Sequence, residues 1–165
     1  MGHNTPSADR TKTLEDNSAT FLITDMVPQV PSNNQQTWAG LEDHTRNLAQ
    51  AGNEVYVIMG SYGVEGAGSD GTKNTIDNGR VTVPSMIWKV IMVIPLGDNY
   101  VSRVTENTRV ISVNTPNINT VNSSWGGYRT MVDAIEAVNG YDLLTELPDD
   151  IEARLESKTE KGPTF

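Results

Sequence analysis

The chain has 165 residues, of which 36% are hydrophobic, and this length suits one domain with its own core. Its formal net charge is −9, which argues against a broad basic surface for polyanions, although a few local arginines and a bound cation can still hold phosphate. The absence of cysteine excludes disulfides, thiolate nucleophiles and cysteine-ligated zinc. No apolar run reaches the roughly 20 residues of a membrane span, and the N-terminus shows no signal-peptide pattern.

The first part of the chain is predicted to hold a loop, a short strand and a long helix. Residues 1–17 are polar and rich in turn formers, which indicates a loop, and the apolar run 21–23 indicates a strand. Asn33 or Asn34 is a candidate N-cap. A helix is expected over 35–51, because apolar residues recur there at helical spacing and a glycine follows.

The rest of the chain alternates β-rich segments with loops before two helices. Residues 63–80 are rich in Gly, Asp and Asn and predict a long exposed loop. The predicted strands cover 54–63, 80–83, 85–96 and 108–116. The predicted helices lie within 128–144 and 147–158. This order favours an α+β fold with a mostly antiparallel sheet and packed helices, as a single domain over residues 1–165.

The helix predicted at 35–51 could carry chemistry along one edge. At helical spacing Asn34, Glu42 and Arg46 fall within roughly a third of the circumference, so an amide, a carboxylate and a guanidinium would lie in a line. The alternative is structural: Asn34 would cap the helix, and Glu42 with Arg46 would form an ordinary surface ion pair. His3, taken alone, would be an exposed histidine near a chain end.

Several segments occur together in a characteristic order. They read GHNTPSADRT, DNSATFLITDMVPQ, NNQQTWAGLEDHTR and YRTMVDAIEAVNGYDLL. In this combination the chain resembles the DNA/RNA non-specific endonucleases, a branch of the ββα-metal, or His-Me finger, nucleases. The resemblance covers nearly the whole chain. It implies a ββα-metal nuclease core and metal-dependent hydrolysis of phosphodiester bonds in DNA and RNA.

The resemblance also implies a role for each matching residue. His3 would be the general base that activates water, and Asn34 would be the protein residue that binds Mg²⁺ directly, with Mn²⁺ as a substitute. Glu42 would hold waters of the metal, and Arg46 would bind phosphate during catalysis. The residues implied to contact nucleic acid are Arg46, Gln29 and Arg10. Such a site fits Mg²⁺, which keeps several of its waters, and a neutral imidazole can take a proton from water near neutral pH.

The chain departs from the family pattern at its beginning. Met1 stands where the family has an arginine before Gly-His, the strands that precede it in the family are missing, and Asp25 replaces an asparagine. We therefore expect an N-terminally truncated nuclease with reduced or absent activity. One alternative is a catalytically inactive, nuclease-derived binding or structural module. Another is a fragment that folds poorly because a sheet edge is left unpaired.

The resemblance finally implies partners and a location. DNA and RNA would be the substrates, an inhibitor protein could exist, and no membrane partner is expected. Secretion or a periplasmic location is expected from the family, although the chain itself carries no visible signal.

Overall fold

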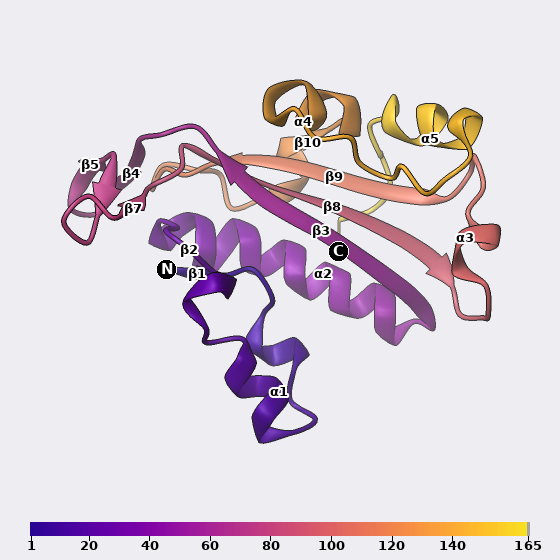
Figure 1. Cartoon of the computed structure of the whole chain (residues 1–165), viewed down its shortest axis with the longest axis horizontal. Coiled ribbons are helices and arrows are strands. Elements are labelled where there is room, and N and C mark those ends of the chain that lie inside the picture. Colours follow the sequence, from indigo (N-terminus) through magenta and orange to yellow (C-terminus); the bar gives the residue numbers. More distant parts are fainter. Residues whose placement is uncertain (165) are drawn as a thin grey trace.

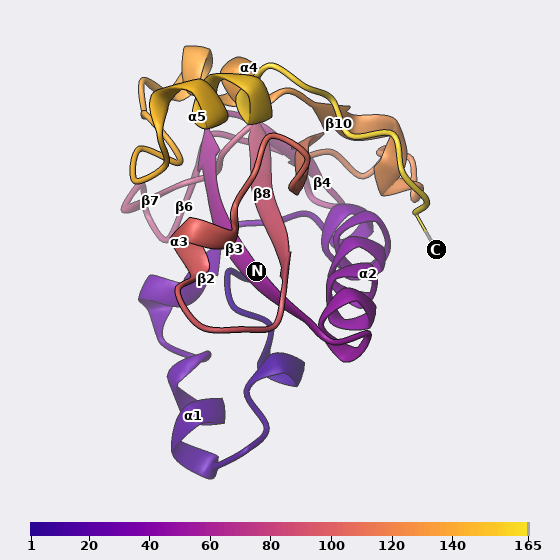
Figure 2. The ribbon, with the colours of Figure 1, turned by 90° about the vertical axis from the view of Figure 1, so that its right-hand side faces the viewer.

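The computed structural model describes residues 1–164. A four-stranded antiparallel sheet in the order β10-β9-β8-β3 forms the middle layer (Figure 1). Helix α2 covers one face of this sheet, and α4 and α5 lie over the other (Figures 1 and 2). The expected α+β architecture with a mostly antiparallel sheet is confirmed.

The main elements have well-defined limits. The sheet strands are β3 Asn53–Tyr62, β8 Met86–Pro95, β9 Arg109–Pro116 and β10 Arg129–Thr130. The helices are α1 Leu14–Ala19, α2 Ala39–Gln50, α3 Tyr100–Arg103, α4 Val132–Asn139 and α5 Asp149–Glu156. A π-helical segment, Asn33–Trp38, runs directly into α2. No helix within residues 1–164 is both long and apolar enough to cross a membrane.

Strand β8 is the centre of the core because both of its faces are buried. Trp88, Val90 and Ile94 pack with the side chains of α4 and α5, whereas Ile91 and Val93 pack with α2. Burial on both faces explains why the strand reads as an almost continuous apolar run.

Short strands and 3-10 turns lie outside the four-stranded sheet and the helices. The additional strands are β1 Gly2–His3, β2 Met26–Val27, β4 Gly66–Gly68, β5 Gly71–Lys73, β6 Thr75–Ile76 and β7 Val81–Thr82. The 3-10 turns are Ser7–Asp9, Ile23–Asp25 and Trp125–Tyr128. The segment predicted as one long loop therefore contains two small hairpins, β4–β5 and β6–β7.

Two expectations for the N-terminal region are wrong. The apolar run 21–23 is not a strand: its side chains are exposed and Ile23 opens a 3-10 turn, because the strand that pairs with the N-terminus is β2. Residues 1–17 are not one loop either. Helix α1 begins within them, and its N-cap Thr13 accepts a hydrogen bond from the Asp16 backbone at 3.0 Å.

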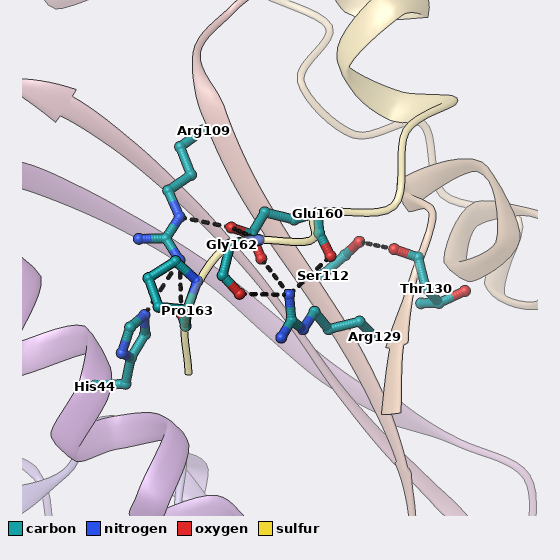
Figure 3. A network of polar contacts seen from close by, with 8 residues as sticks. All are labelled: His44, Arg109, Ser112, Arg129, Thr130, Glu160, Gly162 and Pro163. Carbon is teal, nitrogen blue, oxygen red and sulfur yellow. Dashed lines mark hydrogen bonds and ion pairs between the residues drawn. The ribbon is translucent and has the colours of Figure 1, made fainter. Parts of the chain in front are cut away.

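The C-terminal segment is fastened to the end of the sheet. The Glu160 carboxylate accepts hydrogen bonds from Arg109 Nε at 2.9 Å and from Arg129 Nη1 at 2.8 Å (Figure 3). Arg109 Nη2 also donates to the Pro163 carbonyl at 3.1 Å and lies 3.4 Å from His44 Nε2 on α2. This network joins β9, β10, α2 and the last residues of the chain.

Gly60 on β3 is required because it lies opposite Trp88 on the paired strand β8. A Cβ at this position would lie 2.7 Å from Cζ2 of Trp88, which is 2% exposed. We expect Gly60→Ala to lower the free energy of unfolding by about 1–3 kcal/mol, because a packed core must shift to admit the methyl group. Gly127→Ala is the control, since nothing lies within 4 Å of its added Cβ. Urea unfolding of both variants would check this, and equal stability would contradict it.

His44 makes stability depend on pH. Burial, followed by the charge of Arg109, lowers the pKa of His44 below its ordinary value. The unfolded chain therefore takes up this proton more readily, so His44 costs stability as the pH falls below about 6.5. We expect His44→Gln to lose less unfolding free energy than the wild type between about pH 7.5 and pH 5.5. Equal losses in urea unfolding at the two pH values would count against this.

Candidate active site

The N-terminal segment is held against the body of the protein by β2 and by Asp25. His3 pairs with Met26 in the β1–β2 ladder, and the Asn4 backbone donates to the Asp25 carbonyl at 2.7 Å. The Thr5 backbone donates to Asp25 Oδ1 at 3.0 Å and Oδ2 at 3.2 Å. Asp25, which replaces an asparagine of the family pattern, therefore anchors the backbone that follows His3.

Gly2, the residue before His3, lies next to the amide of Asn34. A Cβ on Gly2 would overlap Gln29 Oε1 and lie 2.8 Å from Asn34 Oδ1, so the backbone before His3 passes close against both side chains. The His3 ring packs edge-on against Phe21 at 5.0 Å, and its Nε2 is buried without a hydrogen-bond partner among residues 1–164. Asn34, the predicted metal ligand, therefore approaches the backbone at Gly2, whereas the ring of His3, the predicted base, packs against Phe21.

Asn33 and Asn34 have different surroundings. Asn33 is fully buried and donates to Thr115 Oγ1 at 3.1 Å and to the Pro116 carbonyl at 2.9 Å, at the end of β9. Gln29 Nε2 donates to Asn33 Oδ1 at 3.1 Å. Asn33 therefore anchors the helix start, and the adjacent Asn34 is left beside Gly2.

The N-cap prediction for these asparagines is wrong. The Asn34 backbone N–H donates to the Val30 carbonyl at 3.0 Å, so Asn34 already lies inside the helical turn rather than at its cap. The segment then continues as a π-helix, a rare form that occurs frequently at functional sites. The change of helical geometry means that α-helical spacing alone does not describe how Asn34 relates to α2.

A cavity of about 550 Å³ lies between the N-terminal segment, α2 and β3, with Lys89 of β8 in its lining. Its polar lining includes Asn4, Thr5, Asp9, Arg10, Glu42, Arg46 and Lys89. Arg46 Nη1 lies 3.0 Å from Asp9 Oδ1, and Arg46 also pairs with Asp43. The predicted residues Glu42, Arg46 and Arg10 thus share one cavity that begins beside His3, whereas Gln29 is buried away from it.

Lys89 is the site residue that sequence reasoning missed. It lies on β8 with 3% of its side chain exposed, and its Nζ is 3.7 Å from Glu42 Oε1 and 4.5 Å from the centre of a Trp38 ring. Burial raises the pKa of Glu42, while the charges of Lys89 and Arg46 oppose this rise. Burial lowers the pKa of Lys89, and Glu42 opposes that change. A lysine inside an apolar central strand was the available signal, since a buried charge needs a partner.

The Glu42–Lys89 pair can be tested by a double-mutant cycle. Glu42→Gln should lower the free energy of unfolding by about 3 kcal/mol, because it leaves a buried ammonium without its anion. Adding Lys89→Met should recover much of this loss, since an apolar side chain then fills the space. Urea unfolding of the single and double variants measures the coupling. Losses that simply add would show that the two charges do not interact.

The chain is similar to known nucleases. A family model described as DNA/RNA non-specific endonuclease matches residues 1–150. The chain is 43% identical over 159 residues to a nuclease of Nostoc sp., covering 96% of this chain and 55% of that protein. It is 30% identical over 162 residues to a nuclease of Serratia marcescens, covering 95% of this chain and 55% of that protein.

A solved structure shares the fold. The crystal structure of the EndoG/EndoGI complex aligns with a TM-score of 0.68 at 22% identity, covering 89% of this chain and 59% of that chain. The chain spans about half the length of the curated relatives it matches. On the family match and the similarity to the Nostoc protein, the chain belongs to the DNA/RNA non-specific endonuclease family.

Proposed function

We propose that this chain is a metal-dependent endonuclease domain that hydrolyses phosphodiester bonds in DNA and RNA without reading their sequence, with activity reduced by its departures from the family pattern at Met1 and Asp25. The observation that supports this most is the cavity that Glu42 and Arg46 share. It begins at Asn4, next to His3, and Asn34 approaches the backbone at Gly2 on the other side of His3 in the sequence. Contacts to the phosphate backbone carry little sequence information, which fits a non-specific activity on both nucleic acids.

The residues present fit a hard divalent cation, Mg²⁺ with Mn²⁺ as a substitute. Asn34 offers an amide oxygen, and the neighbouring Gln29 Oε1 and His3 Nε2 are buried atoms without hydrogen-bond partners in residues 1–164. Oxygen ligands of this kind suit Mg²⁺, which keeps several waters. When bound, such an ion neutralises charge on the phosphate and stabilises the leaving oxygen. Asn34 would hold the ion, and Glu42 would accept hydrogen bonds from its waters.

The other side chains would then move the proton and hold the nucleic acid. His3 Nε2 has no hydrogen-bond partner in the described part of the chain, so it is available to take a proton from water. Arg46 and Arg10 line the cavity and provide local positive charge on a protein of net charge −9. Arg46 would exchange Asp9 or Asp43 for phosphate. Gln29 is buried and would support the site indirectly, by donating a hydrogen bond to Asn33.

Lys89 would act through Glu42. Its ammonium favours the ionised carboxylate in surroundings whose burial favours the neutral acid. An ionised Glu42 can accept hydrogen bonds from two waters, whereas a protonated one would donate at one oxygen. Lys89 is therefore a positioning residue in this proposal.

The proposal extends to partners and location. The structural relative was solved in complex with EndoGI to explain EndoG inhibition, which supports proposing that an inhibitor protein could also cover the present site. Some relatives are named as mitochondrial nucleases, for example EXOG of Mus musculus. A secreted or periplasmic location is the proposal for this chain. Neither the family match nor the similarity to known nucleases favours the alternative of a catalytically inactive module.

Nicking of supercoiled plasmid tests the proposed activity. The purified chain should nick DNA with Mg²⁺ and stop with EDTA. His3→Ala and Asn34→Ala should each reduce the rate by about 10²–10⁴-fold, because one removes the base and the other the metal ligand. Asn47→Ala is a matched control, because Asn47 is exposed on α2 one residue after Arg46, and its rate should stay within about twofold of the wild type.

Two results would contradict this proposal. One is nicking that persists in EDTA or in His3→Ala. The other is no nicking by a folded, monodisperse wild-type chain in Mg²⁺ or Mn²⁺. The Glu42→Gln/Lys89→Met double variant adds a check, because it should be well folded and still impaired.

A further inference from the structure

A second group of acidic side chains lies on the other face of the sheet from α2. Asp133 is in the first turn of α4, Glu136 follows one turn later, and Glu156 is the last residue of α5. One ligand oxygen from each lies within 4.8 Å of the others. The cluster therefore joins two helices that lie together above the sheet (Figure 1).

Glu156 is the unusual member of this cluster. It is 6% exposed, and its Oε1 is buried without a hydrogen-bond partner among residues 1–164. Glu136 is fixed by the Leu143 backbone N–H, which donates to its Oε1 at 2.6 Å, while Asp133 is exposed. Glu156 thus carries an unsatisfied buried oxygen in a carboxylate that lies beside two others.

The charges around Glu156 are all of one sign. Burial and the neighbouring Glu136, Glu152 and Asp133 raise its pKa to about 8. None of the ion pairs found within residues 1–164 includes Glu156, Glu136 or Asp133. Carboxylates held together in a partly buried place are costly unless a proton or a cation joins them.

We propose that Asp133, Glu136 and Glu156 bind a Ca²⁺ ion at the junction of α4 and α5. Ca²⁺ takes six to eight oxygen ligands at about 2.3–2.6 Å, so carboxylate oxygens within 4.8 Å of one another can share one ion. Mg²⁺ is usually bound through only one or two carboxylates and keeps several waters, so a group of three carboxylates suits Ca²⁺ better. The exposed side at Asp133 leaves room for water ligands. This site is separate from Asn34, and it would fasten the C-terminal helix rather than serve the chemistry.

Calcium titration of the full chain tests this proposal. We expect Ca²⁺ to raise the unfolding temperature of the wild type near pH 7.5, and isothermal calorimetry to detect its binding. Glu156→Gln and Asp133→Asn should weaken Ca²⁺ binding by about tenfold or more, since each removes a charged ligand. Asp150→Asn, an exposed change in the first turn of α5, should leave the affinity unchanged. Asn34→Ala should keep the Ca²⁺ effect, which separates this site from the proposed nuclease site.

The stability of the Ca²⁺-free variants distinguishes a lost binding site from misfolding. In EDTA, Glu156→Gln should be at least as stable as the wild type because it removes repulsion, so a lost Ca²⁺ response cannot be put down to misfolding. The proposal is overturned if Ca²⁺ does not bind the wild type, or if Glu156→Gln and Asp133→Asn keep the full response. Stabilisation by mild acid without any effect of Ca²⁺ would also overturn it, by showing that the carboxylates share a proton.

Discussion

Lys89 lies in the middle of the central strand, and its ammonium is held between the Trp38 ring and Glu42 with almost no exposure to water. The helix that carries Glu42 also carries Arg46, and Asn34 precedes it in the same continuous helical segment. The ion pair therefore fixes this helix against β8 at the level of the cavity. An uncompensated charge on either partner would be costly there, so the pair resists rotation of the helix away from the site.

The N-terminal side of the site depends on close backbone packing. Gly2 admits the Gln29 and Asn34 side chains where a larger residue would displace them, and Asp25 holds the two residues after His3 through backbone hydrogen bonds. Asn33 meanwhile binds the end of β9, and its neighbour Asn34 lies next to Gly2. Hydrogen bonds to backbone and amide groups thus position the side of the site at which the metal would bind, and ion pairs position the side facing the nucleic acid.

The periodic spacing of apolar residues predicted the elements whose faces are buried in the core. The strands around β8 and the helix that contains α2 follow from apolar spacing, because their faces are buried in one core. The run 21–23 has the same local pattern but no partner, so its apolar side chains remain exposed. The sequence predicted that Asn34, Glu42 and Arg46 lie along one edge of a helix. It did not predict the π-helical segment, which changes the position of Asn34 relative to the other two.

Other features could not be predicted because they join distant positions. Lys89 is separated from Glu42 by 47 positions in the sequence, and only the sheet brings the two together. The carboxylates of α4 and α5 likewise meet only after both helices pack on the sheet. Local propensity and spacing carry no information about such encounters, although a lysine in an apolar strand marks the need for one.

Diffraction from crystals soaked in Mn²⁺, with an anomalous difference map, would test the central claim most directly. The account predicts an ion on Asn34 Oδ1, with Glu42 reaching it through water and Lys89 still paired to Glu42. An ion bound directly by Glu42, or a map with no peak at Asn34 in crystals that hold Mn²⁺ elsewhere, would contradict it.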